Sequence, residues 1–347
     1  SANPALAELL KQPYVTVPDG PADKDPRKQA VPDFVKLMDE HSQLQNEIER
    51  NPGDASAPFL KSQLGIESAI RGNLLFLLKK YAESVPEFVR AVESGHRTAE
   101  LFYNLALARD RSGSLESALS AYSDALKLNP RLPNAYFNRA RAYHLTGKPS
   151  EAIEDYAKAL TLNPNDAEAA LFRGECYVAN SEYEKSLEDF SQAMALKPND
   201  YRIYLDRGIA LYKGGNTDGA LTDLKRALEL NPKEASAYYF RGLIYSRTGE
   251  YNYEMEDYDQ ALALNPNLSE AYTDRGIAYY VQGKTSRAIE DFNSALKLNG
   301  GDARAYYNRG TAYNRVGQRP AAMADFKKAC ELGVKQACTE IQTQRGR

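Results

Sequence analysis

The tetrapeptide Lys-Leu-Asn-Pro at residues 127–130 decides the fold, because versions of it return every 34 residues. The later copies are Thr-Leu-Asn-Pro (161–164), Ala-Leu-Lys-Pro (195–198), Glu-Leu-Asn-Pro (229–232), Ala-Leu-Asn-Pro (263–266) and Lys-Leu-Asn-Gly (297–300). A fixed period of this length indicates an array of small repeats that contact only their neighbours. With the proline at position 32, eight units, numbered here repeats 1 to 8, begin at residues 65, 99, 133, 167, 201, 235, 269 and 303.

Three columns of the repeated unit have side chains of fixed size. Position 8 is Gly or Ala and position 27 is Ala in every unit, whereas position 24 is always large and apolar. Small residues at fixed places let neighbouring helices approach closely, where a larger side chain would overpack the contact. The position-24 residues are Phe88, Tyr122, Tyr156, Phe190, Leu224, Tyr258, Phe292 and Phe326.

Helix breakers recur at two places in each unit. Position 15 is Gly in six units, which suits the left-handed residue that ends a helix. The Asn-Pro pair near positions 31 and 32 ends a second helix, because the residue before Pro resists the α conformation. Each unit is therefore predicted to be two antiparallel helices of about 12–14 residues.

These columns resemble the tetratricopeptide repeat (TPR) family, whose pattern includes an aromatic, a small residue, Tyr, Ala and an aromatic at set spacings. Repeat 7 matches it with Tyr272, Gly276, Tyr279, Ala288 and Phe292. The resemblance covers 272 of 347 residues. It implies an all-α fold, a right-handed α–α superhelix (TPR solenoid), and a role in protein–protein interaction rather than catalysis.

One pair of columns carries opposite charges. Position 7 is Arg in seven units and position 23 is Asp in six, while repeat 1 has Arg71 and Glu87. Repeat 2 has neither partner, with Leu105 and Ala121 in their places. Joint loss in one unit predicts an ion pair between the two helices of each repeat. The alternative is a solvated charge pair of little energetic weight.

The chain outside the repeats is divided by composition. Residues 1–64 are predicted to be an N-terminal arm and a capping helix, residues 65–336 the TPR array, and residues 337–347 a C-terminal tail. The arm at 11–33 holds five prolines, and residues 33–50 carry an apolar stripe with helical spacing. That stripe would cover the outer face of repeat 1, although a free partner-binding helix is the alternative.

The two last cysteines, Cys330 and Cys338, lie eight residues apart in a segment that resembles the closing segment of Sel1-like repeats. Some secreted members of that group bridge such a pair, and a bridge would imply an oxidising compartment. Two buried free thiols are the equal alternative. Periplasmic or secreted localisation is therefore favoured slightly over cytoplasmic. The sequence begins Ser1-Ala2, without Met or an apolar leader, so we expect a mature or trimmed chain.

Composition and motifs argue against several function classes. The net charge of −3 and pI of about 5.8 disfavour a nucleic-acid binder, and no apolar run is long enough for a membrane span. The three Cys and three His lack metal-ligand spacing, and no cofactor motif is found. Gly283-Lys284-Thr285 mimics the end of a P-loop, but the earlier glycine and the preceding strand are missing. We therefore predict that the protein is not an enzyme, and that it has no cofactor and no metal.

The resemblance implies that the first helix of each repeat lines a concave groove with positions 2, 5, 9, 12 and 13. Tyr offers apolar area together with a hydroxyl, so groove aromatics are candidate contacts, although several of them would pack against neighbouring helices instead. From residue 201 onward these columns are mostly basic, which predicts an acidic or carboxylate-bearing partner segment. The candidate partner-binding residues are Tyr103, Phe137, Arg202, Tyr212, Lys213, Tyr239, Arg247, Tyr280, Arg304, Tyr307 and Arg315. No unit has Lys at position 5, which disfavours the carboxylate clamp that some family members use for chaperone C-termini.

Two functions from different classes follow. The first is a non-catalytic scaffold that binds a peptide or helix of a protein partner in its groove, in bacterial envelope assembly or secretion. The alternative is a substrate-recruiting TPR module of a larger enzyme whose catalytic domain is absent here. Self-association of the array is a further possibility that the sequence leaves open.

Overall fold

The computed structural model describes residues 57–345, and these residues form seventeen α-helices and no strand. The predicted arm and the predicted capping helix at 33–50 lie outside the described residues. The helices are α3 (Ala57–Leu77), α4 (Tyr81–Glu93), α5 (Ala99–Arg111), α6 (Leu115–Leu128), α7 (Pro133–Leu145), α8 (Pro149–Leu162), α9 (Ala167–Ala179), α10 (Tyr183–Leu196), α11 (Tyr201–Lys213), α12 (Thr217–Leu230), α13 (Ala235–Thr248), α14 (Tyr251–Leu264), α15 (Ser269–Val281), α16 (Thr285–Leu298), α17 (Ala303–Arg315), α18 (Arg319–Glu331) and α19 (Lys335–Arg345).

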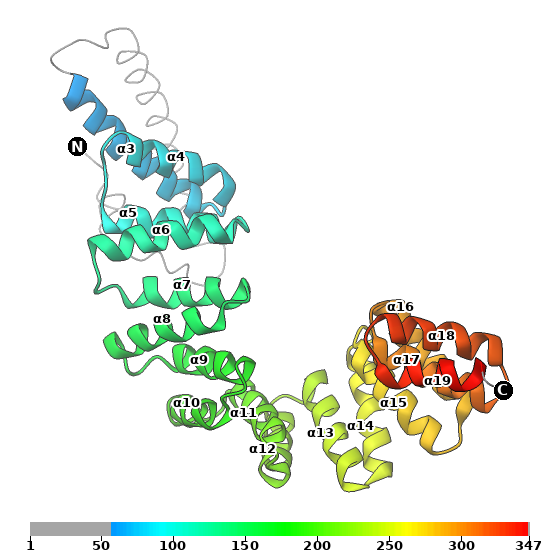
Figure 1. The fold of residues 1–347 in the computed structure, drawn as a ribbon. Coiled ribbons are helices and arrows are strands. Elements are labelled where there is room, and N and C mark those ends of the chain that lie inside the picture. The colour runs from blue at the N-terminus through cyan, green and yellow to red at the C-terminus, as the bar shows by residue number, and fades with distance from the viewer. Residues whose placement is uncertain (1–56, 346–347) are drawn as a thin grey trace. The chain divides into compact units, whose positions relative to one another are not determined.

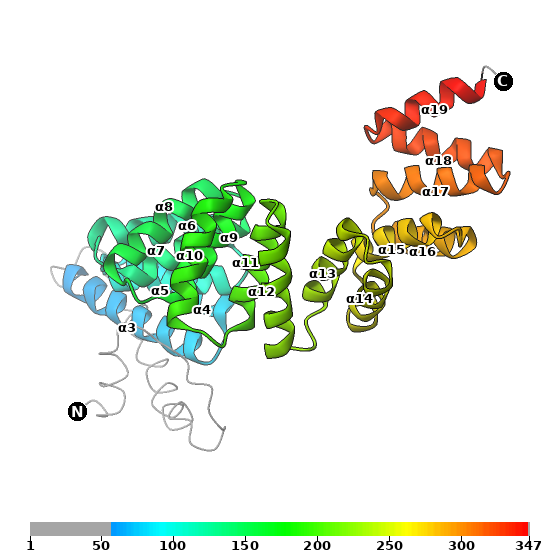
Figure 2. The same ribbon diagram turned by 90° about the horizontal axis from the view of Figure 1, so that it is seen from below.

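The chain divides into two compact units between Ser181 and Glu182. The described part of the N-terminal unit runs from 57 to 181 and stacks α3 to α9 as successive helical layers (Figure 1). The C-terminal unit contains α10 to α19, and Figure 2 shows α17, α18 and α19 stacked in chain order at its end. Within each unit, helices that follow one another in sequence pack against each other.

The first helices of successive repeats also touch one another. Contacts join α3 to α5, α5 to α7 and α7 to α9 in the N-terminal unit, and α11 to α13, α13 to α15 and α15 to α17 in the C-terminal unit. No contact of similar extent joins second helices of successive repeats within either unit. The first helices therefore approach more closely and line the inner side of each unit.

The fixed-size columns build the core as predicted. Every position-24 side chain is at most 1% exposed, and so is every position-27 Ala. The small residue at position 8 makes room for the ring at position 24. A Cβ on Gly72 would lie 2.6 Å from the Phe88 ring, and one on Gly276 would lie 2.7 Å from Phe292. Neither distance is compatible with an ordinary carbon contact, so these two positions require Gly in this backbone.

The turn between the helices of a repeat uses a left-handed residue. The six predicted position-15 glycines have φ between 73° and 88°. Repeats 1 and 4 place Lys79 and Ser181 in the same conformation, with φ of 60° and 62°. A residue with a Cβ is strained there, so these two turns cost free energy that the glycine turns do not.

Two predicted boundaries fall inside helices. Helix α3 begins at Ala57, eight residues before the predicted start of the array, and its 21 residues exceed the predicted helix length. Pro58 stands in its first turn, where Pro is tolerated, and no breaker follows before Leu77. At the other end α19 crosses the predicted boundary at 336/337, because Ala337 and Ile341 pack onto α18 around Phe326.

Candidate partner-binding surface

The Arg–carboxylate columns form ion pairs inside the repeats. In repeats 3, 5, 6, 7 and 8 the position-7 guanidinium donates two hydrogen bonds of 2.6–2.8 Å to the position-23 carboxylate. In repeat 1, Arg71 lies 3.2 Å from Glu87. The five aspartates are 3–6% exposed. The prediction of a pair within each of these six repeats is confirmed, and these residues link the two helices of a hairpin rather than facing a partner.

Tyrosines enclose the same guanidinium groups. Arg275 lies 5.6 Å from the ring centre of Tyr272 and 5.8 Å from that of Tyr279, at positions 4 and 11 of the same helix. Repeats 3, 6 and 8 have the same arrangement. Cation–π attraction stabilises the guanidinium in addition to the ion pair, and the two rings shield the pair from water. The chain has 24 tyrosines, and many of them therefore belong to the framework.

In three repeats the third guanidinium nitrogen reaches the second helix of the preceding repeat. Nη1 of Arg275 lies 2.7 Å from Oδ1 of Asp259, and Nη1 of Arg309 donates to Asn293 at 2.7 Å. The corresponding contact of Arg139 is with Ser123 at 2.9 Å. One arginine thus ties three helices together, two in its own repeat and one in the repeat before.

On the first-helix face of the C-terminal unit, three successive repeats meet at Asp274. The Tyr239 hydroxyl on α13 donates a 2.9 Å hydrogen bond to Oδ2 of Asp274 on α15. The Arg304 guanidinium on α17 pairs with Oδ1 of the same carboxylate. Asp274 is 8% exposed, whereas the side chain of Arg304 is 61% exposed. Burial, followed by the charge of Asp274, raises the pKa of Tyr239, so this hydroxyl stays protonated and keeps donating.

A second contact between repeats involves two predicted residues, Tyr280 and Arg315. The guanidinium of Arg315 lies 4.8 Å from the ring centre of Tyr280, and its Nη1 donates a 3.0 Å hydrogen bond to the Tyr280 carbonyl. Arg315 remains exposed. The structure therefore brings together Tyr239 with Arg304, and Tyr280 with Arg315, on one helical layer.

Arg202 does not fit the prediction of a free cation. It donates to the carboxylate of Asp200 through Nε at 3.0 Å and Nη2 at 2.6 Å. The hydrogen bond from Arg202 is the main cause that lowers the pKa of Asp200. Asp200 also caps the N-terminus of α11, so this guanidinium belongs to a local cap rather than to a partner site.

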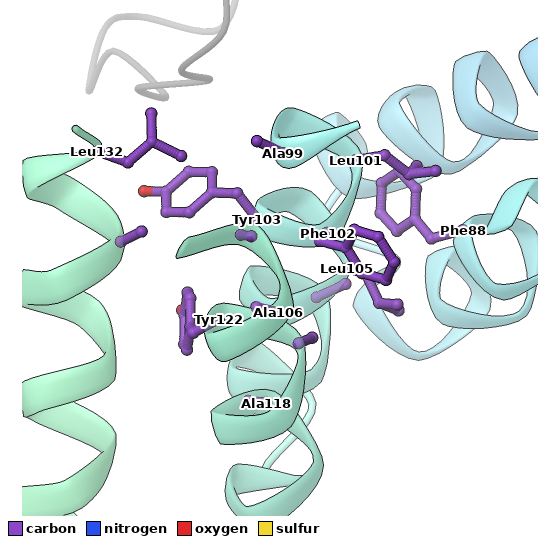
Figure 3. Close-up of a cluster of buried hydrophobic side chains, with 14 of the residues drawn as sticks. Phe88, Ala99, Leu101, Phe102, Tyr103, Leu105, Ala106, Ala118, Tyr122 and Leu132 are labelled. Carbon is purple, nitrogen blue, oxygen red and sulfur yellow. The ribbon is translucent and has the colours of Figure 1, made fainter. Parts of the chain in front are cut away.

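Four predicted aromatic contacts pack within the protein. Tyr103 is 5% exposed, and its hydroxyl accepts a 3.0 Å hydrogen bond from Asn138. Figure 3 shows its ring pointing toward Leu132 and Tyr122. Tyr103 is therefore corrected to a core residue, because Leu132, Tyr122 and Asn138 pack around it. The other three rings are half-buried: Phe137 against Tyr156 and Phe172, Tyr212 against Phe240, and Tyr307 against Phe326.

Lys213 and Arg247 are predicted partner-binding cations whose side chains are exposed to solvent. Both are exposed at position 13, at the C-terminal ends of α11 and α13. Within residues 57–345 neither takes part in an ion pair. Arg315 occupies the same position of α17, so the C-terminal unit presents three exposed cations at equivalent helix ends.

Family models described as tetratricopeptide repeat or TPR repeat match residues 111–147, 133–166, 174–239, 235–268, 257–290, 276–317 and 303–332. The chain belongs to the tetratricopeptide repeat family. Its TPR repeats support a role as a protein-interaction scaffold, since proteins of this family generally bind protein or peptide partners without catalysis. No curated protein matches this chain in sequence.

Solved TPR structures share the fold at low sequence identity. A tetratricopeptide repeat protein from Parabacteroides merdae ATCC 43184 is 23% identical with a TM-score of 0.57, covering 70% of this chain and 96% of that one. The APC/C hetero-tetramer Cut9–Hcn1 is 16% identical with a TM-score of 0.58, covering 80% and 52%. The type IV pilus biogenesis factor PilW is 19% identical with a TM-score of 0.54, covering 61% and 97%.

Sequence reasoning missed Asp274 as an acidic residue of the TPR inner face. Asp274 stands at position 6, a column outside the five counted for groove charge. In the N-terminal unit the acidic partner stands in a counted column: Asp110, at position 12, lies 2.5 Å from Arg141 and accepts a 3.4 Å hydrogen bond from Tyr122. Asp274 neutralises Arg304, so the predicted basic excess of the C-terminal half is smaller than the sequence count. Asp274 could have been found in the sequence as a charged residue at position 6, a position that faces the first helix of the next repeat.

Other kinds of site find no support in the described residues. No cluster of three or more His, Cys, Asp or Glu side chains there has the arrangement of a metal site. No helix between 57 and 345 combines the length and apolarity of a bilayer span.

Proposed function

We propose that this TPR protein is a non-catalytic scaffold that captures an extended segment of a protein partner on the first-helix face of its C-terminal unit. The Tyr239–Asp274–Arg304 network carries the proposal. It fixes side chains from three successive first helices, so the surface is formed before a partner arrives. A preorganised surface lowers the ordering cost of binding.

The partner segment carries carboxylates. Lys213, Arg247 and Arg315 are exposed at equivalent positions of α11, α13 and α17, and none is in an ion pair with a described residue. An extended peptide that runs across these helices would place acidic groups beside them in turn. Complementary charge of this kind favours the correct partner and speeds its association.

The proposed setting is an oxidising compartment, with bacterial envelope assembly or secretion as the process. Cys330 of α18 and Cys338 of α19 form a disulfide with a Cα–Cα distance of 5.0 Å. Disulfides persist in compartments such as the periplasm and are rare in the cytosol. The bridge therefore supports the first of the two alternatives that the sequence left open.

The scaffold proposal is tested by selecting peptides that bind the array and then measuring their affinity for a variant in which exposed cations are replaced by Glu. Random peptides displayed on phage are selected on the wild-type array, and enriched peptides are measured by fluorescence anisotropy. We expect acidic peptides. The triple variant Lys213→Glu/Arg247→Glu/Arg315→Glu should weaken their binding about 10-fold or more, given roughly 0.2–1 kcal/mol for each exposed pair and added repulsion.

The matched control reverses the same number of exposed charges on second helices of the same unit. Lys225→Glu/Lys297→Glu/Lys327→Glu changes α12, α16 and α18 and gives the same net charge. Equal loss of affinity in both triple variants would show a general charge effect and contradict the proposed face. Enrichment of peptides without acidic residues would contradict the proposed partner chemistry.

A further inference from the structure

Repeat 2 differs from the other repeats at the place where their ion pair lies. Leu105 and Ala121 occupy the positions that hold Arg and Asp elsewhere, and both line a cavity of about 330 Å³. The cavity lies in the N-terminal unit among α4, α5 and α6. We name it the repeat-2 pocket. It is distinct from the first-helix face of the C-terminal unit that the proposed function uses.

The wall of the repeat-2 pocket is apolar. Phe102 and Leu105 come from α5, Ala121 from α6, and Val89 and Val92 from the second helix of repeat 1. Figure 3 shows Phe102 and Leu105 side by side, away from the ring of Tyr103. A cavity of this volume holds one large apolar side chain or a small ligand, and it is too small for a helix.

Two guanidinium groups border the apolar wall. Arg109 replaces the Tyr that most repeats have at position 11, and it is half-buried. Its hydrogen bond goes from Nη1 to the Ser117 carbonyl at 3.0 Å, and no described carboxylate forms an ion pair with it. Burial lowers the pKa of Arg109, and the charge of Asp124 opposes that shift. Arg97 is exposed and lies 5.7 Å from the Phe102 ring centre.

Two acidic side chains also border the pocket, and neither forms an ion pair with Arg109 or Arg97 in the described residues. Asp124 attracts Arg109 by its charge and is in an ion pair with Lys127 at 2.8 Å. Glu93 also borders the pocket, and it is exposed at the end of α4. The half-buried cation next to an apolar wall therefore selects a ligand that joins an apolar group to a carboxylate.

We propose that the repeat-2 pocket binds the C-terminal residue of a peptide chain. Its apolar side chain lies against Val89, Phe102 and Leu105, and its terminal carboxylate meets Arg109 and Arg97. A chain end supplies both groups on one residue, within the volume that the pocket offers. The site thus gives the scaffold a second, chemically different recognition point, and it stands whether or not the proposed face of the C-terminal unit is correct.

The test uses N-acetylphenylalanine, N-acetylphenylalaninamide and the peptide N-acetyl-Gly-Gly-Phe with a free carboxylate. Binding is followed by NMR of methyl-labelled protein, at Val89, Val92 and Leu105. We expect the free acid to bind with a Kd of about 1 mM, the range for a ligand of its size. The amide should bind at least fivefold more weakly, and the peptide acid at least as tightly as N-acetylphenylalanine.

The blocking variant restores the residues of the other repeats. Leu105→Arg/Ala121→Asp rebuilds the framework pair inside the pocket, and it should keep the helical circular-dichroism signal while raising the Kd more than tenfold. Ala121→Leu fills the cavity without adding charge and should have the same effect on binding. Arg109→Gln keeps a donor for the Ser117 carbonyl, and it should remove the preference for acid over amide.

Four results would overturn the proposal. They are no shift of the pocket methyls in the wild type, undiminished binding by both cavity-filling variants, equal binding of acid and amide, and binding of N-acetylphenylalanine without binding of the peptide acid. The last result would assign the pocket to a free small acid instead. Failure of the acidic-peptide selection on the C-terminal unit leaves these measurements unchanged, so the two proposals fail separately.

Discussion

Repeat 7 and repeat 2 hold the same helical hairpin together in different ways. Repeat 7 buries the Arg275–Asp291 pair between two tyrosines, while repeat 2 uses Leu105 and Ala121 and leaves a pocket. Both keep the small residue at position 8 and the buried ring at position 24. The comparison teaches that packing of the position-8 and position-24 side chains is enough to form the hairpin. The ion pair is not required, but it can be lost only when both of its residues are replaced together.

The largest expected effect comes from breaking one half of the pair. Arg275→Leu leaves Asp291 buried without its partner and should cost about 3–5 kcal/mol of unfolding free energy. Arg275→Leu/Asp291→Ala copies repeat 2 and should cost much less. Urea unfolding, with hydrogen exchange of α15 and α16, measures both. A double variant as unstable as the single one would contradict the comparison.

A smaller effect is expected from the disulfide at the end of the array. A link matters more for α19, whose described contacts are with α18 and its surroundings, than for a helix packed between two neighbours. Reduction of Cys330–Cys338 should lower the local stability of α19 by about 2 kcal/mol. Hydrogen exchange with and without reductant measures it.

The N-terminal unit supplies the control for that reduction. Cys176 is buried and free, and burial raises the pKa of its thiol to about 12. Its alkylation by iodoacetamide should stay slow before and after reduction. Equal protection of α19 in both redox states would show that packing around Phe326 holds this helix without the bridge.

Repeats 6 and 7 allow a third test at position 20, where Glu254 replaces the small residue that repeat 7 supplies as Ala288. Glu254 is 3% exposed, and burial raises its pKa. An acid whose pKa is raised by folding stabilises the fold at low pH and loses that contribution as the pH rises through the raised value. Glu254→Ala should therefore add about 1 kcal/mol at neutral pH.

The pH profile identifies the cause. The advantage of Glu254→Ala over wild type in thermal unfolding should grow between about pH 4 and about pH 7, where an acid with a raised pKa becomes charged. Glu256→Ala, which removes an exposed carboxylate from the same helix, is the control. A constant difference across this range would assign the effect to side-chain volume.

The smallest effect concerns the turn. Ser181→Gly and Lys79→Gly place in repeats 4 and 1 the residue that repeat 7 uses at Gly283. Relief of left-handed strain exceeds the entropy that Gly adds to the unfolded chain, so each should gain about 0.5 kcal/mol. Ser112→Gly, at a residue with φ of −87°, is the control and should gain nothing. A loss in thermal unfolding temperature for the two turn variants would contradict this account.

Most of the framework was predictable because the same residue types recur at the same positions of each repeat. One period of 34 residues predicted the hairpins, the position-24 core, the glycine turns and the ion pair. The ends were predicted less well, since a proline column fixes the register of repeats and says nothing of where a flanking helix starts. Helix α3 therefore begins before its predicted repeat, and α19 continues past the predicted array.

The candidate site was less predictable because it depends on side chains from different repeats. Arg202 and Arg304 look equally free in the sequence, yet Asp200 holds one and Asp274 holds the other. Tyr103 and Tyr239 share position 5, but the first is a buried core residue and the second is half-buried and donates to Asp274. The position of a residue in the repeat predicts which face of the helix it lies on. Whether its side chain is exposed depends on the side chains of the adjacent repeats.

The third guanidinium nitrogen of the position-7 arginines couples the unfolding of adjacent repeats. Where Arg139, Arg275 and Arg309 bridge to the preceding repeat, opening one hairpin breaks a bond in the next, so adjacent repeats melt together. Repeat 2 has Leu105 at this position, so no arginine bridge reaches the hairpin of α3 and α4, and the hydrogen bond from Asn104 to Asn73 at 2.8 Å joins α5 to α3 instead. Without the arginine bridge, we expect this hairpin to be coupled less strongly to its neighbour, so that it opens while the hairpins from repeat 2 onward stay folded.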